Sequence, residues 1–145
     1  MSDEKKVAMM NDFVKSLEEQ DREKLMSLIT DDFCWHNPHG SFCGREEMNR
    51  YLDWFHKNTT NLKFRDVGSE KVIQGDRAIY EHEISGVMQG EKVTFLTMCS
   101  YKFNKDKIQD VSTVYDRLSL AEQASSSWLP KKMVNSVVNQ MQKGL

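Results

Sequence analysis

The chain has 145 residues, of which 39% are hydrophobic and 29% charged, as is typical of one globular domain with a buried core. Its formal net charge of -2 excludes the broad basic surface of a nucleic-acid-binding or anionic-membrane-binding protein, so neither partner is expected. No apolar run reaches the length of a membrane span, and the N-terminal MSDEKK lacks the apolar segment of a secretory signal.

Helical periodicity dominates the first part of the chain. A helix is expected near residues 4–19, where apolar side chains recur at three- and four-residue steps: Val7, Met10, Phe13, Val14 and Leu17. Asp21 is a natural N-cap for a shorter helix over 21–29. A third helix is expected near 45–57, with one apolar side formed by Met48, Tyr51, Leu52 and Phe55.

Between the second and third helices lies the stretch DDFCWHNPHGSFCG. Phe33 to Asn37 is predicted to be a short strand that Pro38 and Gly40 end. The cysteines of the chain are odd in number and form no CxxC pair, so no disulfide framework is expected: Cys34, Cys43 and Cys99. This pattern favours a reducing compartment, and therefore a cytoplasmic location.

The pattern changes to strands after Leu62. Four segments are expected, separated by the polar turn sequences QGDR, MQGE and NKDK: 62–74, 77–88, 92–103 and 107–118. Such short links join neighbouring antiparallel strands, so the second half is predicted to be a meander sheet. Pro130 is expected to open a last helix. The chain is therefore predicted to be one α+β domain over 1–145, with 130–143 as an appended C-terminal helix.

The order of elements and three landmark stretches resemble the nuclear transport factor 2-like superfamily, particularly its SnoaL-like and ketosteroid-isomerase-like members: LITDDFCWHNPHGSFCGREEM, VIQGDRAIYEHEISGVMQGEKVTF and YKFNKDKIQDVSTVYDRLSLAEQ. The resemblance implies a cone, in which a strongly curved sheet wraps around the N-terminal helices and leaves a cavity with an open mouth. Members use this cavity as an acid–base enzyme site, as a ligand pocket, or hardly at all, so the fold alone does not decide the function.

The candidate catalytic residues are Asp116 and His82. Residues two apart on a strand share a face, and the resemblance turns the set containing Ser112, Val114 and Asp116 toward the cavity. On the 77–88 strand the resemblance turns Ala78, Tyr80, His82 and Ile84 inward. The outward alternation of Glu81 and Glu83 supports the same choice.

Asn37 occupies the position at which the resembling isomerases carry a catalytic aspartate. An amide can orient a ligand but cannot act as a general base, so any proton carrier is expected to be Asp116, His82 or both. Asn37 and Tyr80 are the candidate groups for holding a substrate oxygen. The expected apolar walls of the ligand pocket are Trp35, Tyr51, Trp54, Phe55 and Met98.

Each of these residues also has a structural interpretation. Asp116 could pair with Arg117 or cap a helix that starts near Ser119, and a histidine on an apolar sheet face is commonly a core residue. Alternation places His36 outside the cavity, and His39 is expected to be a turn residue. No His, Cys or Asp cluster has metal-ligand spacing, so neither a metal nor a cofactor is expected.

Two classes of function remain. The first is cofactor-free acid–base chemistry, of isomerase, cyclase or hydrolase type, on a small carbonyl or hydroxyl compound. The second is a non-catalytic domain that binds a small apolar ligand or mediates dimerisation. A homodimer through the outer sheet face is expected because apolar residues occur on both faces of the 92–103 strand: Val93, Phe95, Leu96 and Met98.

Overall fold

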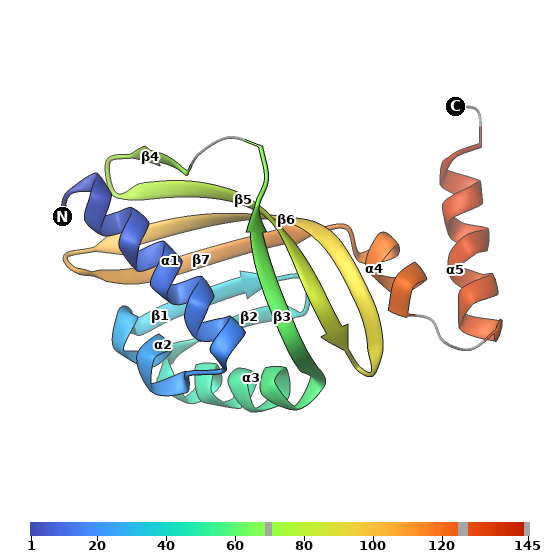
Figure 1. Ribbon diagram of the computed structural model, residues 1–145, viewed down its shortest axis with the longest axis horizontal. Coiled ribbons are helices and arrows are strands. Elements are labelled where there is room, and N and C mark those ends of the chain that lie inside the picture. The colour runs from blue at the N-terminus through green and yellow to red at the C-terminus, as the bar shows by residue number, and fades with distance from the viewer. Residues whose placement is uncertain (69–70, 125–127, 144–145) are drawn as a thin grey trace.

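The computed structural model describes residues 1–68, 71–124 and 128–143 (Figure 1). Three helices come first, and two more follow the sheet: α1 (Asp3–Glu19), α2 (Arg22–Leu28), α3 (Gly44–Asn58), α4 (Arg117–Ala124) and α5 (Trp128–Met141). The three helices predicted at 4–19, 21–29 and 45–57 are confirmed to within two residues at each end.

The strands form one sheet in the order β2-β1-β7-β6-β5-β3, with β4 paired to the beginning of β5. Their bounds are β1 (Ile29–Asn37), β2 (Gly40–Cys43), β3 (Thr59–Asp66), β4 (Val72–Gln74), β5 (Arg77–Met88), β6 (Glu91–Asn104) and β7 (Lys107–Tyr115). The β5–β6–β7 meander is antiparallel as predicted, whereas β1 joins β7 in parallel. The sheet is curved and does not close on itself (Figure 1).

The concave side of the sheet receives the apolar faces of α1 and α3. The first helix is capped by Ser2, whose hydroxyl accepts from the Lys5 amide at 3.4 Å. From α1 and α3 the core receives Met10, Phe13, Val14, Leu17, Met48, Tyr51, Leu52 and Phe55. Helical periodicity selects these positions, because one face of each helix must leave water; Val7, which it also selects, is only partly buried.

The close antiparallel pairing of β3 with β5 depends on Gly86. A Cβ placed there would lie 2.8 Å from Leu62 Cδ2 and 3.1 Å from the Thr60 carbonyl oxygen. The register of β3 also shifts between Thr60 and Lys63, as at a bulge that bends the strand. This bend brings the inward side chains of β3 toward the helices.

Three strand boundaries differ from the expectation. The predicted 62–74 strand is two strands, β3 and β4. The predicted 107–118 strand ends at Tyr115, because the residues after it turn into α4. The short strand predicted at Phe33 to Asn37 begins earlier, at Ile29, and returns as β2 after a two-residue turn.

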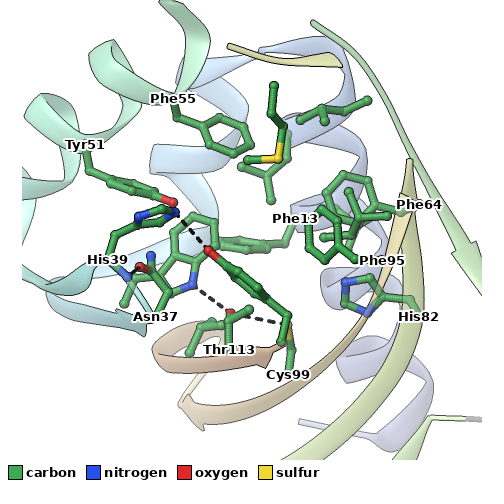
Figure 2. A pocket seen from close by; sticks show the side chains of 18 of the residues that line it. Phe13, Asn37, His39, Tyr51, Phe55, Phe64, His82, Phe95, Cys99 and Thr113 are labelled. Carbon is green, nitrogen blue, oxygen red and sulfur yellow. Dashed lines mark hydrogen bonds between the residues drawn. The ribbon is translucent and has the colours of Figure 1, made fainter. Parts of the chain in front are cut away.

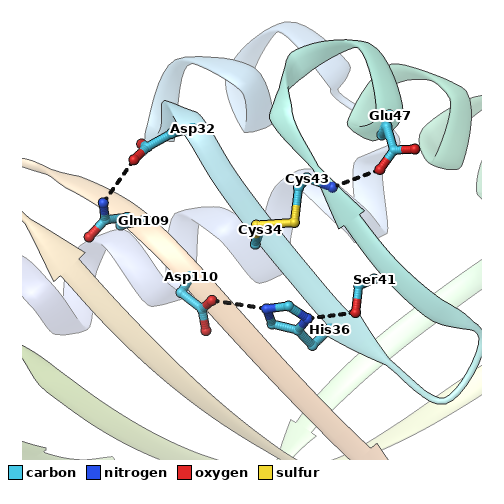
Figure 3. The surroundings of a disulfide bond; sticks show 8 residues. All are labelled: Asp32, Cys34, His36, Ser41, Cys43, Glu47, Gln109 and Asp110. Atoms are coloured by element: carbon cyan, nitrogen blue, oxygen red, sulfur yellow. Dashed lines mark hydrogen bonds and ion pairs between the residues drawn. A yellow bond between two sulfur atoms is a disulfide. The ribbon is translucent and has the colours of Figure 1, made fainter.

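The expectation that the cysteines stay unpaired is wrong for two of the three. Cys34 and Cys43 form a disulfide across the β1–β2 hairpin, with their Cα atoms 4.1 Å apart (Figure 3). They are register partners across the hairpin, a relation that linear spacing does not reveal. Cys99 is free and buried. The cysteine argument for a reducing compartment therefore no longer holds, and a cytoplasmic location stays a prediction.

The two C-terminal helices differ in how they meet the sheet. In α4, the Gln123 amide bonds both the N–H and the carbonyl of Thr94, at 2.7 and 2.9 Å. Through this side chain, α4 covers the edge of β6 beyond the end of β7. The last helix, α5, packs against α4 and stands apart from the sheet (Figure 1). None of the described helices has the length and hydropathy needed to cross a membrane.

Candidate functional site

A cavity of about 60 Å³ lies between the concave face of the sheet and the helices α1 and α3 (Figure 2). Every helix and strand that forms the cone contributes to it except α2, β2 and β4. The lining residues are Phe13, Val14, Leu17, Trp35, Asn37, His39, Tyr51, Trp54, Phe55, Leu62, Phe64, His82, Ile84, Met88, Phe95, Cys99, Tyr101, Val111, Thr113 and Tyr115. Among the described residues, none that lines the cavity is an aspartate or glutamate.

Six of the nine predicted site residues meet in this cavity. They come from β1, α3 and β5: Trp35, Asn37, Tyr51, Trp54, Phe55 and His82. The helix supplies three of them because Tyr51, Trp54 and Phe55 are three or four residues apart and so share one face.

Asp116 does not lie in the cavity, and the prediction that placed it there is wrong. Its side chain is exposed, and Oδ1 accepts from the backbone N–H of Leu118 at 2.8 Å and of Ser119 at 3.2 Å. These contacts are those of a helix N-cap. The structural interpretation of Asp116 is therefore the correct one.

The error arose from the choice of face on β7. Val111 is fully buried and Thr113 is nearly so, whereas Val114 is 61% exposed. The inward set is therefore Val111, Thr113 and Tyr115. The acidic set of this strand, with Asp110 and Asp116, was turned inward by the resemblance. The rule that placed Glu81 and Glu83 outward on the 77–88 strand, applied here, would have turned that set outward.

Tyr80 and Met98 also lie outside the cavity. Tyr80 is buried as expected, but its hydroxyl donates to Asp66 and its ring stacks on His82 with centroids 4.3 Å apart. Met98 is 45% exposed on the outer face, because its neighbours Thr97 and Cys99 take the inward positions of β6. His36 also lies outside, as its alternation with Trp35 predicts, with Nε2 3.2 Å from Asp110 Oδ2 (Figure 3).

His82 forms part of the deep wall. Its side chain is 1% exposed and lies between the rings of Tyr80 and Phe64. Burial lowers the pKa of His82 to about 4, because a charged imidazolium would lose its hydration there. The ring is therefore neutral at pH 7. Nδ1 has no hydrogen-bond partner among the described residues.

A short hydrogen-bonded chain ties the floor of the cavity together. Trp35 Nε1 donates to Thr113 Oγ1 at 2.9 Å, and Thr113 Oγ1 lies 3.3 Å from Cys99 Sγ (Figure 2). Burial raises the pKa of the Cys99 thiol to about 12, so this thiol is not a nucleophile at neutral pH. The hydrogen bond from Trp35 to Thr113 holds the indole in place.

The rim carries a second polar group of residues on the β1–β2 turn. His39 Nε2 lies 2.9 Å from the Tyr115 hydroxyl, and the His39 amide donates to Asn37 Oδ1 at 2.8 Å. Desolvation, and then the positive charge of Arg117, lower the pKa of His39. The Asn37 Nδ2 is buried and has no hydrogen bond of good geometry among the described residues, although the Asn37 side chain acts on the neighbouring Tyr51 hydroxyl, whose pKa it lowers against the larger effect of burial. The amide can therefore donate to a ligand.

The rim pair of His39 and Tyr115 was not among the predicted site residues. His39 belongs to a turn, as expected, but its ring faces the cavity and packs against the ring of Trp54, with the ring centroids 5.1 Å apart. No local pattern indicates the direction of a turn side chain. Tyr115 was assigned to the outward set of β7, and the correct face of that strand would have identified it.

The cavity therefore combines apolar walls with two neutral imidazoles, one deep and one at the rim. This arrangement can enclose an uncharged apolar body, donate a hydrogen bond from Asn37, and exchange a proton at His39. Among the described residues, no three His, Cys, Asp or Glu side chains come together as potential metal ligands.

Sequence and structure comparisons point to one family. The family model described as the SnoaL-like domain matches residues 10–111. No curated protein matches the chain with significance.

Three solved structures have the same fold. A hypothetical protein with a ketosteroid-isomerase-like fold from Catenulispora acidiphila, in complex with trimethylamine, is 14% identical, with a TM-score of 0.72 over 80% of this chain and 91% of its own. TerC co-crystallised with polyporic acid is 16% identical, with a TM-score of 0.71 over 82% and 97%. A nuclear transport factor 2-like protein of unknown function from Burkholderia pseudomallei is 12% identical, with a TM-score of 0.74 over 87% and 100%.

Proposed function

Because the chain belongs to the SnoaL-like domain family, we propose that its cavity binds a small, largely apolar molecule that carries a carbonyl or hydroxyl group. One observation carries the proposal: the cavity is walled by aromatic and aliphatic side chains and contains the buried, unpartnered Asn37 Nδ2. Pockets for small molecules combine apolar walls with a few placed polar groups in this way. Two neighbours crystallised with small molecules, polyporic acid and trimethylamine, support it.

The size of the cavity limits the ligand. Its volume of about 60 Å³ is well below the ~300 Å³ of small ligand pockets. A ligand of a few heavy atoms fits the cavity as it stands. A larger one requires His39, Tyr115 or Met88 to move at the mouth.

The chemistry that we propose is cofactor-free acid–base chemistry with His39 as the proton carrier. The lowered pKa of His39 keeps the imidazole neutral at pH 7, so a ring nitrogen can accept a proton from a carbon beside a carbonyl or from a hydroxyl. The Tyr115 hydroxyl, 2.9 Å away, orients the ring. The carboxylate nearest in register to His82, that of Asp66, accepts from the Tyr80 hydroxyl outside the cavity, and burial keeps His82 neutral, so His82 supplies a neutral polar wall.

Binding is tested by the fluorescence of the cavity tryptophans, Trp35 and Trp54, during titration with cyclohexanone and cyclohexanol. We expect saturable quenching that Asn37→Leu weakens. The matched control is Asn104→Leu, which changes an exposed asparagine at the far end of β6. Binders are then assayed for exchange of their carbon-bound protons with deuterium. Loss of exchange in His39→Gln, with retained binding, is the expected result; undiminished exchange contradicts the role of His39.

A second function, self-association, is supported by the outer face of the sheet. Four apolar side chains are 45–61% exposed on three neighbouring strands: Ile79, Leu96, Met98 and Val114. Met98 is the register partner of Val114, so they lie side by side. We propose that a second copy of the chain covers this face. Sedimentation should give a dimer mass that Leu96→Lys reduces to a monomer mass, whereas Val72→Lys, on β4, should not.

A further inference from the structure

Three hollows meet at the mouth of the cone. The interior cavity shares His39 and Trp54 with both of the outer ones. One outer hollow lies between the β1–β2 hairpin and α3, and includes Arg50. The other lies between the turn, α3, the end of β5 and α4, and includes Arg117. A ligand that enters the cavity therefore passes His39 and Trp54, with an arginine on each side.

The charge of this mouth is of one sign. Among the described residues that line the three hollows, Arg50 and Arg117 are the permanently charged ones, and none is an aspartate or glutamate. Arg50 pairs with Glu47 at 3.1 Å, outside the hollows. No ion pair of Arg117 occurs among the described residues, and the neighbouring Asp116 carboxylate is engaged as the cap of α4.

The field of Arg117 reaches the rim. Its positive charge adds to desolvation in lowering the pKa of His39, and it opposes the effect of burial that raises the pKa of Tyr115. A nearby cation disfavours the protonated imidazolium and favours an ionised tyrosine, so Arg117 lowers the pKa of both groups. An anionic oxygen at the rim would therefore be attracted, and the donor Asn37 Nδ2 lies on the same side of the cavity.

We propose that the ligand is an amphipathic anion, in which an apolar body fills the cavity and a carboxylate lies at the mouth between Arg117 and Arg50. This inference rests on the proposed function and specifies the ligand class of the same site. The apolar interior excludes the charged end, because burying an unpaired carboxylate is costly. The two arginines stabilise it where water still reaches it. The ligand therefore enters with its apolar end first, and its carboxylate stays at the mouth.

The test compares two probes of equal chain length, hexanoate and 1-hexanol, by isothermal titration calorimetry at low salt. The wild-type protein should bind hexanoate several-fold more tightly than hexanol, and the two should compete for one site. Arg117→Gln should weaken hexanoate binding by about two- to fivefold, as for a partly exposed ion pair, and leave hexanol binding unchanged. Arg50→Gln with Arg117→Gln should remove the preference.

The matched control is Arg77→Gln, which removes an exposed arginine at the opposite end of β5 and should change neither affinity. Added salt should reduce the preference for hexanoate, because it screens exposed charges. Equal binding of both probes, unchanged in the arginine variants, overturns the inference and leaves the proposed function intact. Binding of neither probe rejects the proposed function and this inference with it.

Discussion

The deep wall and the rim of the cavity each present a histidine, and the two differ in almost every physical respect. His82 lies on a central strand, is 1% exposed and contacts aromatic rings. His39 lies in a two-residue turn and is solvent-exposed. Its ring contacts the Tyr115 hydroxyl, and the positive charge of Arg117 acts on it. The pKa is lowered in both. At the wall, burial produces this effect; at the rim, a nearby cation adds to it.

This difference separates structural from functional use of one side-chain type. A fully buried imidazole is held neutral by the fold, and protonating it works against folding. A rim imidazole can meet solvent and ligand, so a change of its charge costs the fold little.

The largest expected effect concerns acid stability at the wall. The folded-state pKa of His82, about 4, lies below its ordinary 6.5, so the unfolded chain takes up the proton first. Stability is therefore lost as the pH falls from about 6.5 to about 4, by about 3 kcal/mol at ~1.4 kcal/mol per unit. His82→Phe should remove most of this slope in urea unfolding curves measured between pH 7 and 4; the remainder comes from His39 and His56, whose pKa values are also lowered.

The control for this measurement is Thr97→Val. Thr97 is the register partner of His82, is buried, and has an unpartnered Oγ1, but it does not titrate. Its replacement should raise stability by about 1 kcal/mol and keep the acid slope. Asp66, whose pKa is lowered by the Tyr80 hydrogen bond, loses its contribution only at lower pH, below about 3.8. An unchanged slope in His82→Phe contradicts the burial argument.

The next effect concerns the hairpin that carries the rim. Replacing both Cys34 and Cys43 with serine opens a loop with a sequence separation of 9, which should lower stability by about 2–3 kcal/mol. Dithiothreitol should lower the urea midpoint of the wild-type protein to that of the double variant and leave the variant unchanged. A wild-type midpoint that is insensitive to reductant shows that this disulfide does not stabilise the fold.

A smaller effect separates capping from catalysis at the end of β7. Asp116→Ala should lower stability by about 1 kcal/mol, whereas Asp116→Asn should change it by only a few tenths, because asparagine caps helices equally well. Ligand binding and any turnover should survive both changes. Turnover abolished by Asp116→Asn at unchanged stability is the outcome expected of a catalytic carboxylate, and it contradicts the conclusion that Asp116 takes no part in turnover.

The smallest effect is the coupling between the two rim side chains. A double-mutant cycle of His39→Gln and Tyr115→Phe should give a coupling free energy of about 0.5 kcal/mol, the value of one partly exposed hydrogen bond. The cycle of His36→Gln with Tyr115→Phe should be additive, because His36 lies on the other face of the sheet. Additivity in both cycles shows that the His39–Tyr115 contact contributes nothing to stability.

The sequence by itself determined the order of elements and much of the deep wall. Helical periodicity identified Phe13, Tyr51 and Phe55, because a helix that packs on a sheet must bury one stripe. On β5, the acidic Glu81 and Glu83 identified the outward face and so turned His82 inward. On these helices and on β5, one face is apolar and the other charged or polar, so the hydrophobic effect determines which face is buried.

Only the tertiary structure decided the rim. On β7 the resemblance placed the set containing Asp116 inward, whereas the structure buries Val111 and Thr113 and uses Asp116 as the cap of α4. The Cys34–Cys43 disulfide and the direction of the His39 ring follow from hairpin register and turn geometry, which bring together residues that no linear period relates. Hydrophobic periodicity indicates which face of a helix or strand is buried. It does not indicate which polar groups meet across the mouth of a curved sheet.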